Sequence, residues 1–286
     1  MLSILIPVYN INCVSLVKKL HEMALLLKSP FEILLADDAS NERIKNENRV
    51  LNQLDECSIF ELETNYGPAF IRNYLAEKAC YPYLLFLDTD TMPIRDNFLS
   101  LYLSYASKQA VCGGFYYQKT NGSVLRYKYG MQVESQPVAE RCKHPHQHFI
   151  GMNFFISKEL FLRVLFDETL HFGYEDAAFG KRLEEAGIVL HIDNPVWHLV
   201  EEDACAFLDK TRRSVRNLLG HEQELLSYVR LLRWYDKLKR LHAVALTAFL
   251  FRVSESFLEK NLIGKHPSLW LFAFYKLGYF CRLSLS

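Results

Sequence analysis

The chain has 286 residues, and 50% of them are hydrophobic, which is ample for a packed core and argues against intrinsic disorder. The 33 Lys and Arg residues balance 33 Asp and Glu residues, so the chain lacks the general positive charge that non-specific nucleic-acid binding requires. Its seven scattered cysteines contain no Cys-x-x-Cys pair, which favours reduced thiols and a cytoplasmic compartment. We expect neither a signal peptide nor an ordinary membrane-spanning helix, because no apolar window is long enough.

In the first ninety residues, apolar runs alternate with helical patterns. We expect strands over 2–8, 31–36, 58–62 and 83–87, and helices over 14–28, 41–53 and from Pro68 onward. Each expected strand ends in polar loop sequence. This order predicts a mostly parallel sheet, covered by helices on both faces, with its binding site at the carboxyl ends of the strands.

The sequence after residue 93 is less regular. We expect an extended segment over 110–117, a second one reaching about Met131, a polar loop over 134–148 and strands over 149–156 and 188–193. Ser157 is placed to cap a helix, and Gly187 to end another. From about residue 207 the sequence becomes helical, basic and aromatic.

The apolar run that begins at Tyr83 stops at two acids, Asp88 and Asp90, which stand one residue apart in an Asp-x-Asp motif. Alternate positions at a strand end face the same side, so two hard oxygen ligands can converge on one divalent cation, and such a cation bridges diphosphate oxygens well. A strand followed by a simple turn, ended by Pro93, is the alternative.

Five short motifs occur in an order and spacing that resemble the family 2 glycosyltransferases. They are Ile6-Pro7-Val8-Tyr9-Asn10, Asp37-Asp38-Ala39-Ser40, Asn65-Tyr66-Gly67 with Arg72-Asn73, Leu87-Asp88-Thr89-Asp90, and Gly173-Tyr174-Glu175-Asp176. The resemblance covers about residues 1–200. It implies the α/β GT-A fold, a nucleotide-sugar donor and inversion at the anomeric carbon.

The resemblance also implies roles in nucleotide binding. Pro7 and Tyr9 would border the base, Asp38 would accept a hydrogen bond from the uracil imide, and Asp37 would shape the same loop. A carboxylate suits an N–H donor such as uracil. Arg72 would lie near the base or the phosphates. A strand-end turn at the two acids and a solvent-facing arginine are the structural alternatives.

The metal site implied by the resemblance uses Asp90, with Asp88 facing the ribose. His198 is the candidate further ligand, and an imidazole would shift the preference from Mg²⁺ toward Mn²⁺. The cation would stabilise charge on the departing nucleoside diphosphate. A core histidine beside Trp197 is the alternative for His198.

Asp176 is the implied catalytic base, with Glu175 beside it to hold acceptor hydroxyls or the sugar. A base on the acceptor side takes the hydroxyl proton while the oxygen attacks the sugar carbon. The alternative is that both acids only complement the positive end of the helix that begins there.

We therefore expect a catalytic domain over 1–205, divided into a nucleotide-binding half, 1–93, and an acceptor-binding half, 94–205. Its expected reaction is inverting, metal-dependent transfer of a hexose or N-acetylhexosamine from a UDP-sugar to a glycan or lipid-linked acceptor, in bacterial surface polysaccharide biosynthesis. A sugar-phosphate nucleotidyltransferase and a non-catalytic glycan- or nucleotide-binding relative are the alternatives. The first should show a glycine-rich basic loop after its first strand, and the second should lack Asp90 or Asp176.

The helical region over 206–286 leaves two interpretations open. Basic residues alternate with leucines and aromatics over 230–241, as in a helix that lies on a membrane surface. Residues 269–280 are apolar, but Lys276 interrupts them, so a span is not expected. We expect either peripheral contact with the inner face of the cell membrane, or packing of these helices on the catalytic part or on a second copy.

Overall fold

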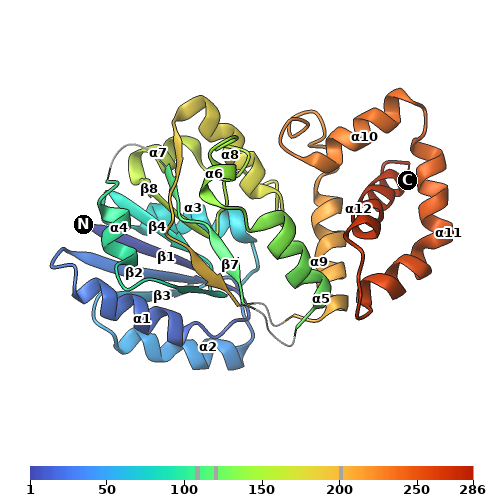
Figure 1. The fold of residues 1–286 in the computed structure, drawn as a ribbon. Coiled ribbons are helices and arrows are strands. Elements are labelled where there is room, and N and C mark those ends of the chain that lie inside the picture. The colour runs from blue at the N-terminus through green and yellow to red at the C-terminus, as the bar shows by residue number, and fades with distance from the viewer. Residues whose placement is uncertain (107–109, 119–121, 200–201, 286) are drawn as a thin grey trace.

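A seven-stranded sheet with the order β3-β2-β1-β4-β8-β6-β9 forms the centre of the protein (Figure 1). The structure is a computed structural model that describes residues 1–106, 110–118, 122–199 and 202–285. The strands are β1 Leu2–Val8, β2 Phe31–Asp37, β3 Cys57–Glu61, β4 Tyr83–Leu87, β6 Ala110–Cys112, β8 Asn153–Ser157 and β9 Val189–His191. Only β8 runs antiparallel to its neighbours, which confirms the expected mostly parallel sheet.

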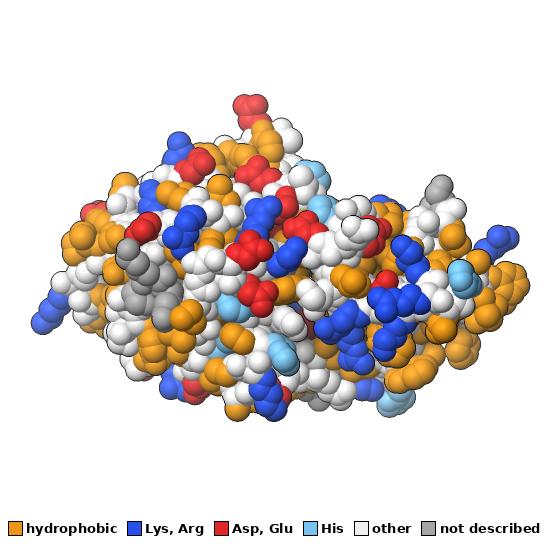
Figure 2. Space-filling model, turned by 90° about the horizontal axis from the view of Figure 1, so that it is seen from above, with side chains coloured by type: hydrophobic (Ala, Val, Ile, Leu, Met, Phe, Trp, Pro, Cys, Tyr) orange, Lys and Arg blue, Asp and Glu red, His pale blue; other side chains and the backbone are white. Residues whose placement is uncertain are grey.

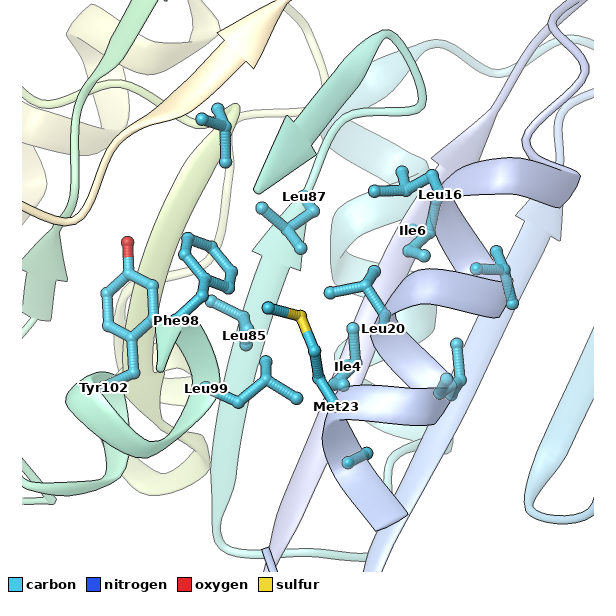
Figure 3. Close-up of a cluster of buried hydrophobic side chains, with 14 of the residues drawn as sticks. Ile4, Ile6, Leu16, Leu20, Met23, Leu85, Leu87, Phe98, Leu99 and Tyr102 are labelled. Carbon is cyan, nitrogen blue, oxygen red and sulfur yellow. The ribbon is translucent and has the colours of Figure 1, made fainter. Parts of the chain in front are cut away.

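Helices cover both faces of this sheet, because successive strand residues point to opposite sides. Helices α1 Val14–Leu25 and α4 Phe98–Leu103 pack on one face, where Ile4, Ile6 and Leu85 meet Leu20 (Figure 3). On the other face lie α3 Pro68–Lys78, α7 Lys158–Val164 and α8 Glu175–Ala186. The polar helix expected over 41–53 is α2 Glu42–Asn48, continued by the 3₁₀ turn Arg49–Gln53.

A second, three-stranded sheet stands beside the first, with β10 Val196–His198 between β5 Thr91–Pro93 and β7 Phe115–Tyr117. Strand β10 is antiparallel to β5, and its register sets His198 opposite Thr91. This pairing brings Trp197 and His198, which follow the segment 188–193 expected as the last strand, next to the Asp-x-Asp motif.

Two sequence expectations in the middle of the chain are wrong. The single extended segment over 110–117 is broken into β6 and β7 at Gly114, which has a φ of +81° that a glycine adopts readily. The extended stretch toward Met131 is instead helix α5 Val124–Tyr129 with a π-helical turn over Gly130–Glu134. The Ser123 side chain caps α5, and burial of Leu125 overrides the strand preference of its valine and tyrosines. The loop over 134–148 also contains the short helix α6 Val138–Arg141.

Four helices follow the last strand: α9 Ala204–Asn217, α10 Arg230–Arg240, α11 Val244–Ile263 and α12 Leu269–Leu283 (Figure 1). They enclose a third apolar core, to which Leu125, Leu170 and Ala178 of the preceding part contribute. The helical extension is therefore confirmed and packs against the rest of the molecule. The boundary at residue 205 stays a prediction.

The apolar stretch over 269–280 contributes mainly to this third core, whereas over 230–241 Leu232 is buried and Trp234 and Leu241 are exposed. Leu232, Phe272, Tyr275, Tyr279 and Phe280 are all buried in it. Among the described helices, none has by itself the length and apolar content of a membrane span. Helices α10 and α11 meet that criterion only as a pair, with a bend of 118° between them.

Candidate active site

A cleft of about 580 Å³ opens where the carboxyl ends of β1, β2 and β4 meet the C-terminal helices. Its wall on the sheet side includes Pro7, Tyr9, Asp38, Asp88 and Asp90. Parallel strands that end at one edge bring these residues together although they are far apart in sequence. The side toward the C-terminal helices comes from α5, α9 and α12.

The two acids after β2 have different contacts. Asp38 is buried and accepts hydrogen bonds from the backbone N–H groups of Tyr66 at 2.7 Å and Gly67 at 2.8 Å. Burial raises the pKa of Asp38, although these two bonds oppose the rise. Asp37 accepts the backbone N–H of Ser40 at 2.7 Å, so it shapes the turn after β2. Of the pair, Asp38 lines the cleft.

Tyr9 and Pro7 lie at the end of β1, and half of the Tyr9 side chain is exposed to solvent. The Asn10 N–H donates to Ser40 Oγ at 2.7 Å, which ties this loop to the turn after β2. An exposed aromatic ring on a fixed loop is suited to stack on a planar base.

Arg72 on α3 lies among three carboxylates. Its Nη2 is 2.9 Å from Asp88 Oδ1, and its Nη1 is 3.3 Å from Glu175 Oε1 and 4.0 Å from Asp176 Oδ1. The side chain is 4% exposed, and its guanidinium also lies over the Phe166 ring. One buried cation therefore holds the end of β4 and the start of α8 together. Arg72 does line the cleft, but its recorded polar contacts are with carboxylates.

Asp176 has an unusual acidity for a carboxyl group. Burial, followed by repulsion from Glu175, raises its pKa to about 7, and the attraction of Arg72 only partly offsets the rise. A third of the side chain remains exposed. The backbone approaches closely here, because a Cβ atom on Gly151 would clash with Asp176 Oδ1. The group is thus balanced between its charged and neutral forms near neutral pH.

Asp90 and His198 form a pair at the cleft wall. His198 Nε2 lies 3.0 Å from Asp90 Oδ2, and Leu199 N donates to Asp90 O at 2.7 Å. Burial tends to raise the pKa of Asp90, but the charge and hydrogen bond of His198 outweigh it and leave the pKa below its ordinary value. The imidazole is 6% exposed, and in the described part of the chain its Nδ1 has no hydrogen-bond partner.

This pair is chemically suited to a divalent cation. A carboxylate oxygen and an imidazole nitrogen are both common ligands of Mn²⁺, and both groups line the cleft. The described residues hold no set of three or more His, Cys, Asp or Glu side chains grouped as metal ligands. Of the described residues, Asp90 and His198 are the pair suited to ligate a cation here, and Asp88 is turned toward Arg72.

The loop that precedes Glu175 is held from two sides. Gly67, with a φ of +90°, lies so close to the His171 carbonyl that a Cβ atom would clash with it. Gly173, with a φ of +77°, packs so closely on Ser214 of α9 that a Cβ atom would clash with the serine side chain. Close backbone packing therefore fixes the position from which α8 presents its two acids.

The C-terminal helices contribute cations to the cleft that the sequence did not single out as site residues. These are Lys210 and Arg213 of α9 and Lys276 of α12. Lys276 Nζ lies 3.0 Å from Tyr129 Oη and above the Tyr129 ring. Burial lowers the pKa of Lys276. The signal in the sequence was its position inside an otherwise apolar helix that carries one other cation, Arg282.

The sequence matches the family model described as glycosyl transferase family 2 over residues 3–165, more than half of the chain. A protein of Haemophilus influenzae named as an uncharacterized glycosyltransferase is 33% identical over 101 residues. That match covers 34% of this chain and 39% of the relative, so it spans well under half the length of either.

Two solved structures have a similar fold. The mannosyltransferase PcManGT of Pyrobaculum calidifontis, in complex with GDP-Man and Mn²⁺, has a TM-score of 0.59 at 15% identity, with 99% of this chain and 85% of that one covered. TarS 1–349 of S. aureus, in complex with UDP, has a TM-score of 0.53 at 16% identity, covering 98% and 89%. With its α/β GT-A fold and its family match, the chain belongs to glycosyltransferase family 2.

Proposed function

We propose that the protein is an inverting glycosyltransferase that moves a hexose or N-acetylhexosamine from a UDP-sugar to a glycan or lipid-linked saccharide. The observation that supports this most directly is the meeting of two acidic groups at one cleft: Asp90 with His198, and Asp88 with Glu175 beside Arg72. Asp176 is next to Glu175 in the chain, and its Oδ1 lies 4.0 Å from Arg72 Nη1, although it is not itself among the residues that line the cleft. Similar folds bind UDP, UDP-GlcNAc and GDP-Man.

In the proposed complex Tyr9 and Pro7 border the base, and Asp38 faces its imide edge. The backbone bonds of Asp38 to Tyr66 and Gly67 fix the orientation of its carboxylate, which has further lone pairs for a base N–H. Lys210, Arg213 and Lys276 face the same cleft, and their positive charge is suited to the diphosphate.

Asp90 and His198 would hold Mn²⁺ or Mg²⁺. When bound, the cation supplies positive charge that stabilises the leaving diphosphate. Asp88 is the acid of the Asp-x-Asp motif that contacts Arg72, and its position is suited to the ribose.

Asp176 acts as the base in this mechanism. Its carboxylate takes the proton of the acceptor hydroxyl while that oxygen forms a bond to the sugar C1 and the bond from C1 to the phosphate oxygen breaks. A pKa near 7 is suited to a base that works at neutral pH. Glu175, held by Arg72, is placed to orient hydroxyl groups of the sugar or acceptor. Attack from the face opposite the leaving group inverts the carbon.

The deciding experiment is a donor panel. The protein is incubated with UDP- and GDP-sugars and candidate acceptors, with Mn²⁺, with Mg²⁺ or with chelator, and the released nucleotide is measured. UDP release that depends on metal and acceptor supports the proposal, and a product of the opposite anomeric configuration establishes inversion. Tight UDP binding without turnover with any acceptor would favour the non-catalytic relative.

We further propose that the acceptor belongs to a bacterial surface polysaccharide and that transfer takes place at the inner face of the cell membrane. The C-terminal helices, which line one side of the cleft, are the part of the chain suited to this location. This assignment is tested by adding radiolabelled donor to a lysate of cells that produce the protein. The label is then measured in the lipid-extractable and soluble fractions.

A further inference from the structure

Helix α11 exposes a continuous apolar stripe on its outer side. Its members occur at positions i, i+3, i+4, i+7 and i+11 and are between 49% and 71% exposed: Leu246, Phe249, Leu250, Val253 and Phe257. Residues at this spacing lie on one side of a helix. The opposite side of α11 is buried in the third core through Phe251, Leu258 and Leu262. The stripe is therefore additional to the side that packs the fold.

The charged residues of α11 differ in exposure and pairing. Its two acids turn inward: Glu255 lies 2.7 Å from Arg282 Nη1 and 3.5 Å from Arg212 Nη2, and Glu259 also pairs with Arg212. The cations Arg252 and Lys260 are exposed instead, as is Lys265 just after the helix. Among the described residues these three cations have no carboxylate partner. The outward surface thus combines apolar side chains with uncompensated positive charge.

We infer that the outward surface of α11 docks on an anionic lipid surface. An interfacial helix needs exposed apolar side chains to insert between headgroups and cations to pair with anionic lipids, and this surface supplies both. Figure 2 shows exposed hydrophobic side chains at the outer edge of the C-terminal part.

A second copy of the chain fits this surface less well. In a twofold contact the same patch meets itself, so Arg252, Lys260 and Lys265 of both copies would approach one another. Like charges brought together in this way oppose association. The charge pattern therefore favours anionic lipid.

Docking through α11 would keep the active-site cleft close to the lipid. Helix α12 packs against α11, since a Cβ atom on Gly278 would clash with Phe251, and the same helix lines the cleft with Phe272 and Lys276. Packed helix axes lie roughly 8–10 Å apart, so about one helix layer separates the lipid from the cleft. The inference rests on the proposed function, sugar transfer at a membrane. Lipid binding and sugar transfer are measured in separate assays.

The test is flotation of the full chain with vesicles that contain phosphatidylglycerol, compared with vesicles of phosphatidylcholine alone. We expect the protein to float with the anionic vesicles and to be released by added salt. The double variant Phe249→Ser/Val253→Ser should lower partitioning by about 10-fold or more, because two exposed apolar side chains are lost. The control Leu25→Ser/Leu26→Ser removes two equally exposed leucines at the end of α1 and should float like the wild type.

A charge variant separates electrostatic from apolar binding. Arg252→Gln/Lys260→Gln should weaken partitioning to the anionic vesicles by about 5-fold per cation and leave the neutral vesicles unaffected. All these positions are exposed, so the variants should keep the thermal midpoint and the UDP affinity of the wild type.

Failure of the wild type to float with anionic vesicles would overturn the inference, as would flotation of the stripe variant at the wild-type level. A wild type that sediments as a dimer, with a monomeric stripe variant, would assign the surface to self-association instead. If the wild type floats with anionic vesicles but transfers no sugar, the result would count against the proposed function alone.

Discussion

His198 Nε2 lies 3.0 Å from Asp90 Oδ2, although 108 residues separate the two along the chain. The register of β10 on β5, which sets His198 opposite Thr91, brings them together. Within the part of the chain that the structure describes, neither side chain has another ion pair, so the two together form a ready pair of ligands at the cleft wall.

Replacing Asp90 by alanine should abolish metal-dependent UDP binding, because a hard oxygen ligand of the cation is lost. Calorimetry of UDP binding, with and without Mn²⁺, measures this. Asp55→Ala, an exposed acid elsewhere, is the control and should behave like the wild type. Unchanged Mn²⁺-dependent affinity in the Asp90 variant would refute the metal assignment.

His198→Ala should reduce transfer and alter the ratio of the rates with Mn²⁺ and Mg²⁺, because an imidazole ligand favours the softer Mn²⁺. Steady-state rates at matched concentrations of the two ions provide the comparison, with the exposed His266→Ala as control. If the thermal midpoint falls while the ratio stays constant, His198 is a core residue only.

Asp176→Asn should leave UDP affinity nearly intact and lower transfer by about 100-fold or more, the scale of a lost general base. The base is active when deprotonated, so wild-type activity should fall as the pH drops through about 7. A pH profile of kcat/KM in both proteins checks this. Wild-type turnover in the variant would remove Asp176 from the mechanism.

Arg72→Gln should move the acidic limb of the pH profile to higher pH, because the cation that favours the charged form of Asp176 is lost. Arg141 is the matched control: it is equally buried, but it contacts carbonyl oxygens and His191. Arg141→Gln should lower the thermal midpoint without moving the limb. Equal shifts in the two variants would indicate general destabilisation.

Lys276→Met should weaken binding of UDP by roughly 10-fold, the scale of a charge-assisted hydrogen bond, and leave binding of uridine unchanged. Titrations with uridine, UMP and UDP locate the loss on the phosphates. Lys18→Met, an exposed lysine on α1, serves as control. A similar loss for uridine would show that Lys276 only supports the shape of the cleft.

Local sequence determined the first half of the fold. Strand β1 and strand β4 have the bounds expected from their apolar runs, and Pro68 begins α3 as expected. Buried parallel strands are continuous apolar segments, and they end where polar loop residues begin, so both signals lie within a few residues. For the same reason the motifs at the strand ends, such as Asp88 and Asp90, were found without coordinates.

Tertiary structure decided what these residues contact. Arg72 lines the cleft, and its expected place near the base or phosphates stays a prediction. The tertiary structure added its contacts with Asp88 and with Glu175, which is 103 residues away in the chain. The region from 124 to about Met131, expected to be extended, is helical because its Leu125 is buried among the C-terminal helices. Packing with distant segments outweighs local propensity at such positions.

In the C-terminal helices, too, the sequence determined some properties and the tertiary structure decided others. The sequence determined that they are helical, basic and aromatic, since these properties follow from composition and spacing. Which side faces outward depended on how they pack: Phe272 and Tyr275 became core, Lys276 reached the cleft, and the exposed apolar stripe fell on α11. A helix with apolar residues on several sides buries the side that its neighbours can cover, and only the assembled fold specifies which one that is.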